Sequence, residues 1–385
     1  MKKKQFLVPF LILTIFFGIS MPASVGLDKR PLNLRSQVAI WVNGTDLAIS
    51  IGADLEPAMY LWNATDGMAV DTPKVRFSIP PRSYILDLNP TGTASVGGTT
   101  EVIMWKFSDS SVKKLPIYES LNVSNILFTS VAWGDNIYLG TDGLGYSIQQ
   151  DANEPVQYLT NESESVVLQF DPTDLQLTGV FNVGSAVTSL EALADGGLAI
   201  GLKNGSLLVR DNEIFSSYSY KSTINVIKWQ NNALYVAEGN RVHIIDNEDV
   251  QTIQTRNEIT AMVPSPDGQK IAVGYTNETV DVYFLNNTML WSKSFGHFEV
   301  FQNPITYLDW KDDKLLISKK LEMATSHDAN TGTLLSQIGI DTNITIMALE
   351  NHSSNNEITY YPNLFFAIIF ILINKRNKKL RVERS

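Results

Sequence analysis

The sequence of 385 residues contains no cysteine and only four histidines. Disulfide bonds, thiolate metal sites and lipid attachment through a cysteine are therefore excluded, and a chain of this length can bury a sufficient core without disulfides. The histidines lie far apart, without the spacing of metal ligands. Glycine-rich phosphate loops and nucleophile elbows are also missing. The sequence therefore predicts no catalytic residue, no metal site and no cofactor.

What the sequence does contain is a pattern that recurs seven times: an apolar segment, a tight polar turn and a second segment of small apolar residues. LDLNPTGTASVGG and MVPSPDGQKIAVGY are two of the seven copies. The turns lie at Gly44, Gly92, Gly134, Gly196, Asn231, Gly268 and Asp312. Strand-rich units that repeat about every 40 to 45 residues are typical of propeller blades.

Each unit continues in the same order. An alternating third segment follows, as in SLLVRDNE and TVDVYFLNNT, and a fourth precedes the next unit, as in MLWSKSF at residues 289–295. Four antiparallel strands cannot bury both faces alone, so neighbouring units must stack. The pattern predicts an all-β propeller of seven four-stranded blades. Residues 343–353 align with 258–268, which leaves an eighth inner strand, completed by the N-terminal PLNLRS segment, as the alternative.

The repeated residues carry a resemblance to two families. SPDGQKIAVG resembles the inner turn of WD-repeat propellers, whereas HDANTGTLLSQ and NNTMLWSKSF resemble quinoprotein-like (PQQ-like) repeats. The resemblance covers residues 37–340 and implies a propeller fold. It implies no activity, because the acidic and amide ligands of quinoprotein enzymes have no match in this sequence.

The two ends of the chain predict its location. Lys2, Lys3 and Lys4 precede an apolar run and small residues, which is the order of a secretory signal. An apolar stretch at 358–373 precedes six basic residues, and the positive-inside rule places such a tail in the cytoplasm. An uncleaved N-terminal anchor and a buried last strand are the respective alternatives. We expect a signal peptide (1–26), an extracytoplasmic propeller (27–342), a stalk or closing strand (343–357), a transmembrane anchor (358–373) and a basic cytoplasmic tail (374–385).

Charge and glycosylation motifs agree with an exterior domain. Without the three N-terminal lysines, the six basic tail residues and Glu383, 21 basic and 39 acidic residues remain, a net charge of −18. Such a domain repels phosphate, so nucleic acid is not expected as a partner. Nine sequons mark candidate glycosylation sites at Asn43, Asn63, Asn122, Asn161, Asn204, Asn277, Asn286, Asn343 and Asn351. A cysteine-free, sequon-rich chain with a minimal C-terminal anchor resembles archaeal surface proteins.

Two connections depart from the repeat and predict a binding surface. An insertion at 144–165 separates the second and third strands of the third unit and carries Asp151, Glu154 and Tyr158. The connection at 294–304 carries His297, Phe298 and Phe301. Both connection types emerge on one face of a propeller, where exposed aromatics are typical of binding hot spots. A mobile insertion and phenylalanines packed between blades are the alternative.

We therefore expect a non-catalytic binding module for a protein or glycan ligand at the cell surface. The alternative is an extracytoplasmic hydrolase or lyase that uses acidic residues at the propeller mouth, because two acids brought together in space can cleave glycosidic bonds. Buried carboxylates at the central channel would favour the enzyme, and an aromatic rim would favour the binding module.

Overall fold

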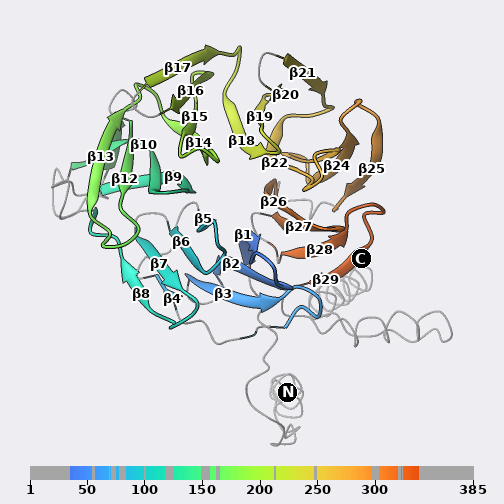
Figure 1. Cartoon of the computed structure of the whole chain (residues 1–385), viewed down its shortest axis with the longest axis horizontal. Coiled ribbons are helices and arrows are strands. Elements are labelled where there is room, and N and C mark those ends of the chain that lie inside the picture. The colour runs from blue at the N-terminus through green and yellow to red at the C-terminus, as the bar shows by residue number, and fades with distance from the viewer. Residues whose placement is uncertain are drawn as a thin grey trace, which may run out of the picture.

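A computed structural model shows seven antiparallel sheets arranged in a ring (Figure 1). It describes residues 35–53, 57–68, 70, 75–77, 84–98, 101–117, 125–148, 157–161, 165–211, 214–246, 249–295, 303–319, 322 and 324–337. Six sheets pair their four strands in chain order from the centre of the ring outward, and the third does so through β9, β10, β12 and β13, with β11 added beside β10. The prediction of an all-β propeller with seven four-stranded blades is therefore confirmed.

Each blade has the same four positions. The inner strands are β1 (Arg35–Trp41), β5 (Ile85–Leu88), β9 (Asn125–Trp133), β14 (Val187–Ala192), β18 (Ile224–Gln230), β22 (Ile259–Pro264) and β26 (Ile305–Lys311). The second strands are β2 (Leu47–Ala53), β6 (Ala94–Gly98), β10 (Ile137–Ile148), β15 (Leu198–Leu202), β19 (Ala233–Glu238), β23 (Lys270–Tyr275) and β27 (Lys314–Lys319). The third strands are β3 (Pro57–Asn63), β7 (Val102–Lys106), β12 (Val166–Phe170), β16 (Ser206–Asp211), β20 (Arg241–Asp246), β24 (Thr279–Phe284) and β28 (Thr325–Asp328). The outer strands are β4 (Val75–Arg76), β8 (Val112–Lys114), β13 (Leu177–Asn182), β17 (Ile214–Ser219), β21 (Asp249–Gln254), β25 (Met289–Ser294) and β29 (Leu334–Gln337).

The alternating strand directions give the ring two distinct faces. Because every pair within a blade is antiparallel, connections from the second to the third strand and from the outer strand to the next blade emerge together. We call that end the upper face. The repeated polar turns of the sequence, such as those at Gly92 and Gly268, join first to second strands and lie on the opposite, lower face. Gly92 and Gly268 have φ angles of +67° and +66°, a conformation that glycine adopts without strain.

The small residues of the second strands have a packing role. A Cβ atom added to Gly201 would lie 2.7 Å from a side-chain carbon of Ile224, the first residue of the next inner strand. At Gly274 the corresponding distance to Ile305 would be 2.4 Å. Both distances are below van der Waals contact, so the absence of a side chain permits the next blade to approach. The pattern of small residues in the sequence therefore encodes the stacking of blades.

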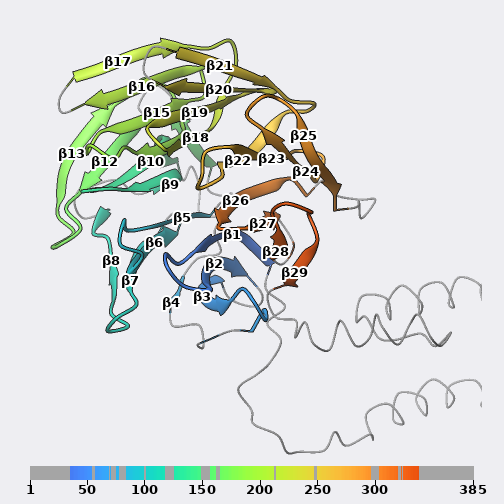
Figure 2. The same cartoon turned by 45° about the vertical axis from the view of Figure 1, so that its right-hand side comes forward.

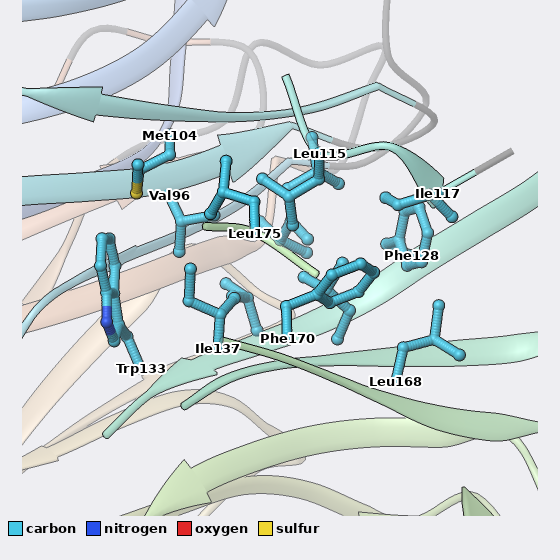
Figure 3. Packing of buried hydrophobic residues seen from close by; sticks show 14 of the residues in the cluster. Val96, Met104, Leu115, Ile117, Phe128, Trp133, Ile137, Leu168, Phe170 and Leu175 are labelled. Atoms are coloured by element: carbon cyan, nitrogen blue, oxygen red, sulfur yellow. The ribbon is translucent and has the colours of Figure 1, made fainter. Parts of the chain in front are cut away.

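The hydrophobic core lies between the blades, with one cluster at each of the seven interfaces. The interface between the second and third blades contains Phe128, Phe170, Leu115 and Ile117, all fully buried (Figure 3). Burial of one such side chain stabilises a fold by about 1.5 to 3 kcal/mol. Each blade is therefore stable only between two neighbours, and the ring must be closed.

The ring is closed without a shared sheet among the described residues. The first blade (β1–β4) and the last (β26–β29) lie side by side (Figure 2). Trp41 N–H donates to Asp309 Oδ2 at 2.7 Å, and Ser336 Oγ donates to Ala64 O. Lys311 Nζ and Lys314 Nζ each lie 3.1 Å from Asp46 Oδ1. Polar contacts and the apolar cluster around Trp41 therefore join the two ends of the ring.

The expected terminal segments lie outside the described residues. These include the signal peptide at 1–26, the segment 343–357, which contains most of the alternative eighth strand, the anchor at 358–373 and the basic tail. Over the described ranges, the structure has no helix of the length and apolar character that a membrane span requires.

Substitution of the ring-closing carboxylate tests the contact between the first and last blades. Asp309 also accepts from Trp310 N–H at 2.9 Å, so Asp309→Ala leaves two amides without their acceptor. We expect the free energy of unfolding in urea to fall by about 2 to 4 kcal/mol, since each unsatisfied buried donor costs about 1 to 3 kcal/mol. The exposed Asp313→Ala is the matched control and should change it by less than about 0.5 kcal/mol. Equal effects would contradict a ring-closing role.

Candidate functional site

The seven inner strands enclose a central channel with a cavity of about 210 Å³. All seven blades contribute to its lining, and most of the side chains at its wall are polar or charged. Thr129, Thr188, Asn225, Thr260 and Thr306 come from five successive inner strands. Asp87, Glu191, Lys228 and Tyr307 also line it, together with Tyr84, Ser130 and Ser189.

The channel carboxylates bind the backbone of the following blade. Trp133 N–H donates to Asp87 Oδ2 at 2.7 Å, and Trp229 N–H donates to Glu191 Oε1 at 3.1 Å. Asp309 makes the equivalent contact with Trp41 across the ring closure. Each carboxylate thus receives an inner-strand amide from the next blade. The three acids hold neighbouring blades in register.

Serine and threonine make similar contacts among the third, fourth and fifth blades. Leu190 N–H donates to Ser130 Oγ at 2.7 Å, and Ile227 N–H donates to Ser189 Oγ at 2.9 Å. Thr129 Oγ1 donates to Val187 O at 2.6 Å. Many polar groups of the channel wall are therefore engaged in hydrogen bonds between blades.

Lys228 is the counter-ion of the channel acids. Its Nζ lies 3.4 Å from Glu191 Oε2 and 3.5 Å from the Tyr307 hydroxyl. The side chains of Lys228 and Glu191 keep 23% and 20% of their surface accessible, so water reaches them through the channel. Desolvation lowers the pKa of Lys228, but Glu191, Tyr307 and Asp87 raise it more, and the net pKa lies well above its usual range.

Two of the channel acids have raised pKa values. Removal from bulk water raises the pKa of Asp87 to about 7 and that of Asp309 to about 6, although Lys228 opposes the shift in both cases. The pKa of Tyr307 is also raised by desolvation. At neutral pH the channel therefore holds carboxyl groups near their titration points beside one permanent cation.

The upper face carries the largest departure from the four-stranded plan. β10 is twelve residues long and continues past the blade, where β11 (Gln157–Asn161) pairs with its far end from Leu144 to Ile148. The predicted insertion at 144–165 is therefore a hairpin rather than an irregular loop over its described part. The sequence does not predict this hairpin, because its second strand, QYLTN, has no strong apolar alternation.

The predicted binding residues are only partly placed by the structure. Tyr158 lies in β11 and is paired with Ser147 of β10. Asp151, Glu154, His297, Phe298 and Phe301 lie outside the described residues. The topology brings the two connections that carry these residues to the upper face. Whether they contact one partner stays a prediction.

Phe295, at the start of the 294–304 connection, packs between the sixth and seventh blades. Its ring meets that of His327 edge-on at 5.4 Å, and Lys293 and Lys319 lie over it at 5.7 and 5.1 Å. His327 is buried and bonded through its ring nitrogens to Gly332 O and Thr325 Oγ1. Burial, with Lys293 nearby, lowers the pKa of His327 to about 4. This histidine is structural.

A second buried polar cluster, which the sequence does not reveal, lies in the sixth blade. Asp281 is fully buried and accepts from both hydroxyls of Tyr275 and Tyr283, at 2.9 and 2.8 Å. Arg256, from the preceding connection on the upper face, binds it through two nitrogens. Desolvation raises the pKa of Asp281, but these donors outweigh it and the pKa is lowered overall. Asp281 thus fixes the connection onto the blade.

Other polar residues of the described chain also have structural partners. Glu238 accepts from the backbone of Lys221 and Ser222 at 2.9 Å and contacts His243 Nε2 at 3.1 Å. No group of three histidine, aspartate or glutamate side chains with metal-binding geometry occurs within the described ranges.

The candidate glycosylation sites are distributed over both faces. Asn43 and Asn286 lie in lower-face turns, and Asn204 and Asn277 lie in upper-face turns, all exposed. Asn63 is half-buried at the end of β3, and Asn161 ends β11. Asn122, Asn343 and Asn351 lie outside the described residues. Glycosylation itself stays a prediction.

Removal of the channel cation should cost more at high pH. At pH 8 Asp87 and Asp309 are ionised in the fold and Lys228→Met removes the cation that stabilises their charge, whereas at pH 5 both are protonated. The pKa of each carboxyl group in the fold exceeds the ordinary value of 3.8, so its contribution to the stability of the fold is lost as pH rises from about 4 to 7. Without Lys228 these pKa values rise further, and the loss continues to higher pH. We expect the loss in unfolding free energy to be greater at pH 8 than at pH 5 by at least about 1 kcal/mol. Lys113→Met on β8 is the exposed control, and a pH-independent cost would contradict the counter-ion role.

Acidification should destabilise the protein through His327. Because its folded pKa of about 4 lies below the ordinary 6.5, stability is intact above pH 6.5 and is lost as pH falls toward 4. Between pH 7.5 and 4.5 the loss amounts to about 2 to 3 kcal/mol. His327→Gln lacks this titration, so the difference in unfolding free energy between wild type and variant should shrink by that amount at pH 4.5. A constant difference would show that His327 does not titrate with folding.

The comparisons with known proteins support the architecture. No family model matches the sequence, and no curated protein is similar to it in sequence. Solved structures do match, among them a WD40-type chain of "Crystal Structure of Mitotic Checkpoint Complex". That chain has 13% sequence identity and a TM-score of 0.58, and the match covers 80% of this chain and 94% of that one. At this identity the likeness concerns the fold alone: the protein is a seven-bladed β-propeller with a WD40-type structural neighbour.

Proposed function

We propose that this protein is a cell-surface propeller that binds a partner through its upper face without chemical turnover. The observation that carries the proposal is the hairpin formed by β10 and β11. It is the one addition to the four-stranded plan among the described residues. It extends the blade at the face where the aromatic connection 294–304 also emerges. Residues added on a rigid scaffold, outside its core, are typical of binding loops.

The partner is a protein in our proposal, with a glycan as the second choice. The WD40-type neighbour was solved in a complex, which supports a capacity of this fold for protein interaction. Tyr158, Phe298 and Phe301 are the proposed anchors, since aromatic side chains bury large areas at low entropic cost. Asp151, Glu154 and His297 are the proposed polar contacts around them.

The buried carboxylates of the channel favour a second candidate function, an extracytoplasmic hydrolase or lyase. Asp87 and Asp309 have pKa values suited to proton transfer, and Asp87 lies in the channel wall. However, both oxygens of each already accept backbone amides. The channel volume of about 210 Å³ is also below the roughly 300 Å³ at which ligand pockets begin. Binding at the upper face therefore has the stronger support.

Site-specific photo-crosslinking tests the upper face. A photoreactive amino acid at position 158 or 298 should give a covalent adduct with the partner in cells that make the protein natively. The same amino acid at Val112, 43% exposed on the outer strand β8, should give none. If all three positions crosslink equally, or only position 112 does, the upper face is not the site. Turnover of a glycan or peptide by the purified protein would contradict the non-catalytic proposal.

Protease accessibility tests the proposed location. With a signal at 1–26 and an anchor at 358–373, protease added to intact cells should degrade the propeller and spare an epitope on residues 374–385. Deletion of 364–385 should release the protein into the medium. A propeller protected in intact cells would reverse the topology, and a truncated chain that stays in the membrane would place the anchor at the N-terminus.

A further inference from the structure

We infer that the outer strand of the fourth blade, β17, pairs with the same strand of a second copy of this chain. β17 is an open sheet edge: among the described strands it pairs with β16 alone. Such an edge presents unpaired N–H and C=O groups and is a template for another strand. This inference is independent of the proposed function, because the edge lies on the rim of the ring and not on the upper face.

β17 lacks the features by which sheet edges avoid pairing. Charged residues, which hinder edge pairing, occur in four of the other outer strands: Arg76 in β4, Lys113 and Lys114 in β8, Asp249 in β21 and Lys293 in β25. β29 has only four residues, and every second residue of β13 is half-buried. By contrast, β17 has the six residues IFSSYS, without a charge, proline or bulge. Phe215 and Tyr218 are 42% and 50% exposed.

The free backbone groups can be assigned from one hydrogen bond. Tyr220 N–H donates to Gly205 O at 2.9 Å, in register with the β16–β17 pair. Because bonding alternates along an antiparallel strand, Phe215, Ser217 and Ser219 direct their N–H and C=O groups away from β16. These three residues form the row that a second strand would bind.

The second copy is the occupant because β17 is complementary to itself. Antiparallel pairing about a two-fold axis places each end of one strand beside the opposite end of its partner. Asp211, which pairs with Ile214 at the start of β17, and Lys221, just past the end of β17, are both exposed. Self-pairing therefore brings Lys221 of each copy toward the end of the other strand that lies beside Asp211. Parallel pairing of two copies would instead place like charges at the same end. A strand of another protein would need a basic and an acidic end in the matching positions.

Symmetry and overlap together place the centre of the pair at one of two serines. Directly opposed side chains lie on the same side of a sheet, so the two-fold axis passes through a residue position, and the greatest overlap of two six-residue strands places it at Ser216 or Ser217. At the axis the two copies of that residue face each other with Cα atoms about 4.5 to 5.5 Å apart. The two Ser219 residues are then at least about 13 Å apart along the strands. Edge pairing alone buries less than a standard interface of about 1,200 Å², so the dimer is weak and depends on concentration.

The absence of cysteine makes single-cysteine cross-linking a direct test. Ser216→Cys, Ser217→Cys and Ser219→Cys place one thiol each on the same exposed strand of the full-length protein. Facing cysteines at the axis have Cα distances suited to a disulfide. Under mild oxidation at micromolar protein, we expect either Ser216→Cys or Ser217→Cys to form covalent dimers at least tenfold faster than Ser219→Cys. Equal rates at all three positions, or no dimer at any, would overturn the inference.

A charge exchange tests the orientation. In the cysteine variant that reacts faster, Lys221→Glu should slow dimer formation severalfold, because it places like charges together at both ends. The additional Asp211→Lys change should restore the rate if the strands are antiparallel. If the double change slows the reaction further, the strands do not pair in this orientation. Unchanged thermal unfolding of each variant would confirm that folding is unaffected.

Discussion

Closure of the ring is the constraint on which the rest of this protein depends. Every core cluster lies between two blades, so a blade at an open end would expose an apolar face. No described sheet combines the two chain ends, and the first and last blades meet through side chains instead. A hydrogen bond from Trp41 to Asp309, the ion pairs of Asp46 and the packing around Trp41 together take the place of a shared strand.

The same type of contact recurs around the channel and explains its chemistry. Asp87, Glu191 and Asp309 occupy equivalent inner-strand positions, and each accepts an amide of the next blade. Three carboxylates around one axis repel one another, which accounts for the presence of Lys228 between them. The charged residues of the channel therefore have a structural role, because they hold neighbouring blades together. Our proposals concern the surface instead, at the hairpin of β10 and β11 and at the edge of β17.

The sequence predicts the fold well because the repeat encodes it locally. Glycine turns, alternating third strands and small residues such as Gly201 and Gly274 report the geometry of each blade and its neighbour. Contacts between distant residues are not encoded in this way. Asp281 binds Arg256, and Lys228 binds Glu191, in each case from a different segment of the chain. The spacing of these residues in the sequence does not predict either contact. The hairpin strand β11 lacks apolar alternation, so the sequence does not predict it. The binding residues at 151, 154, 297, 298 and 301 lie outside the described residues and stay predictions.

Residue-resolved hydrogen exchange of the tryptophan amides at the blade junctions tests the account most directly. If carboxylates close and register the ring, the amides of Trp41, Trp133 and Trp229 exchange only through global unfolding, with protection equal to that of the buried second strands. The account predicts equal free energies of opening for all three. Exchange of Trp41 that is much faster than that of Trp133 and Trp229 would mean that the junction between the last and first blades opens by itself, and would contradict a ring held closed by Asp309.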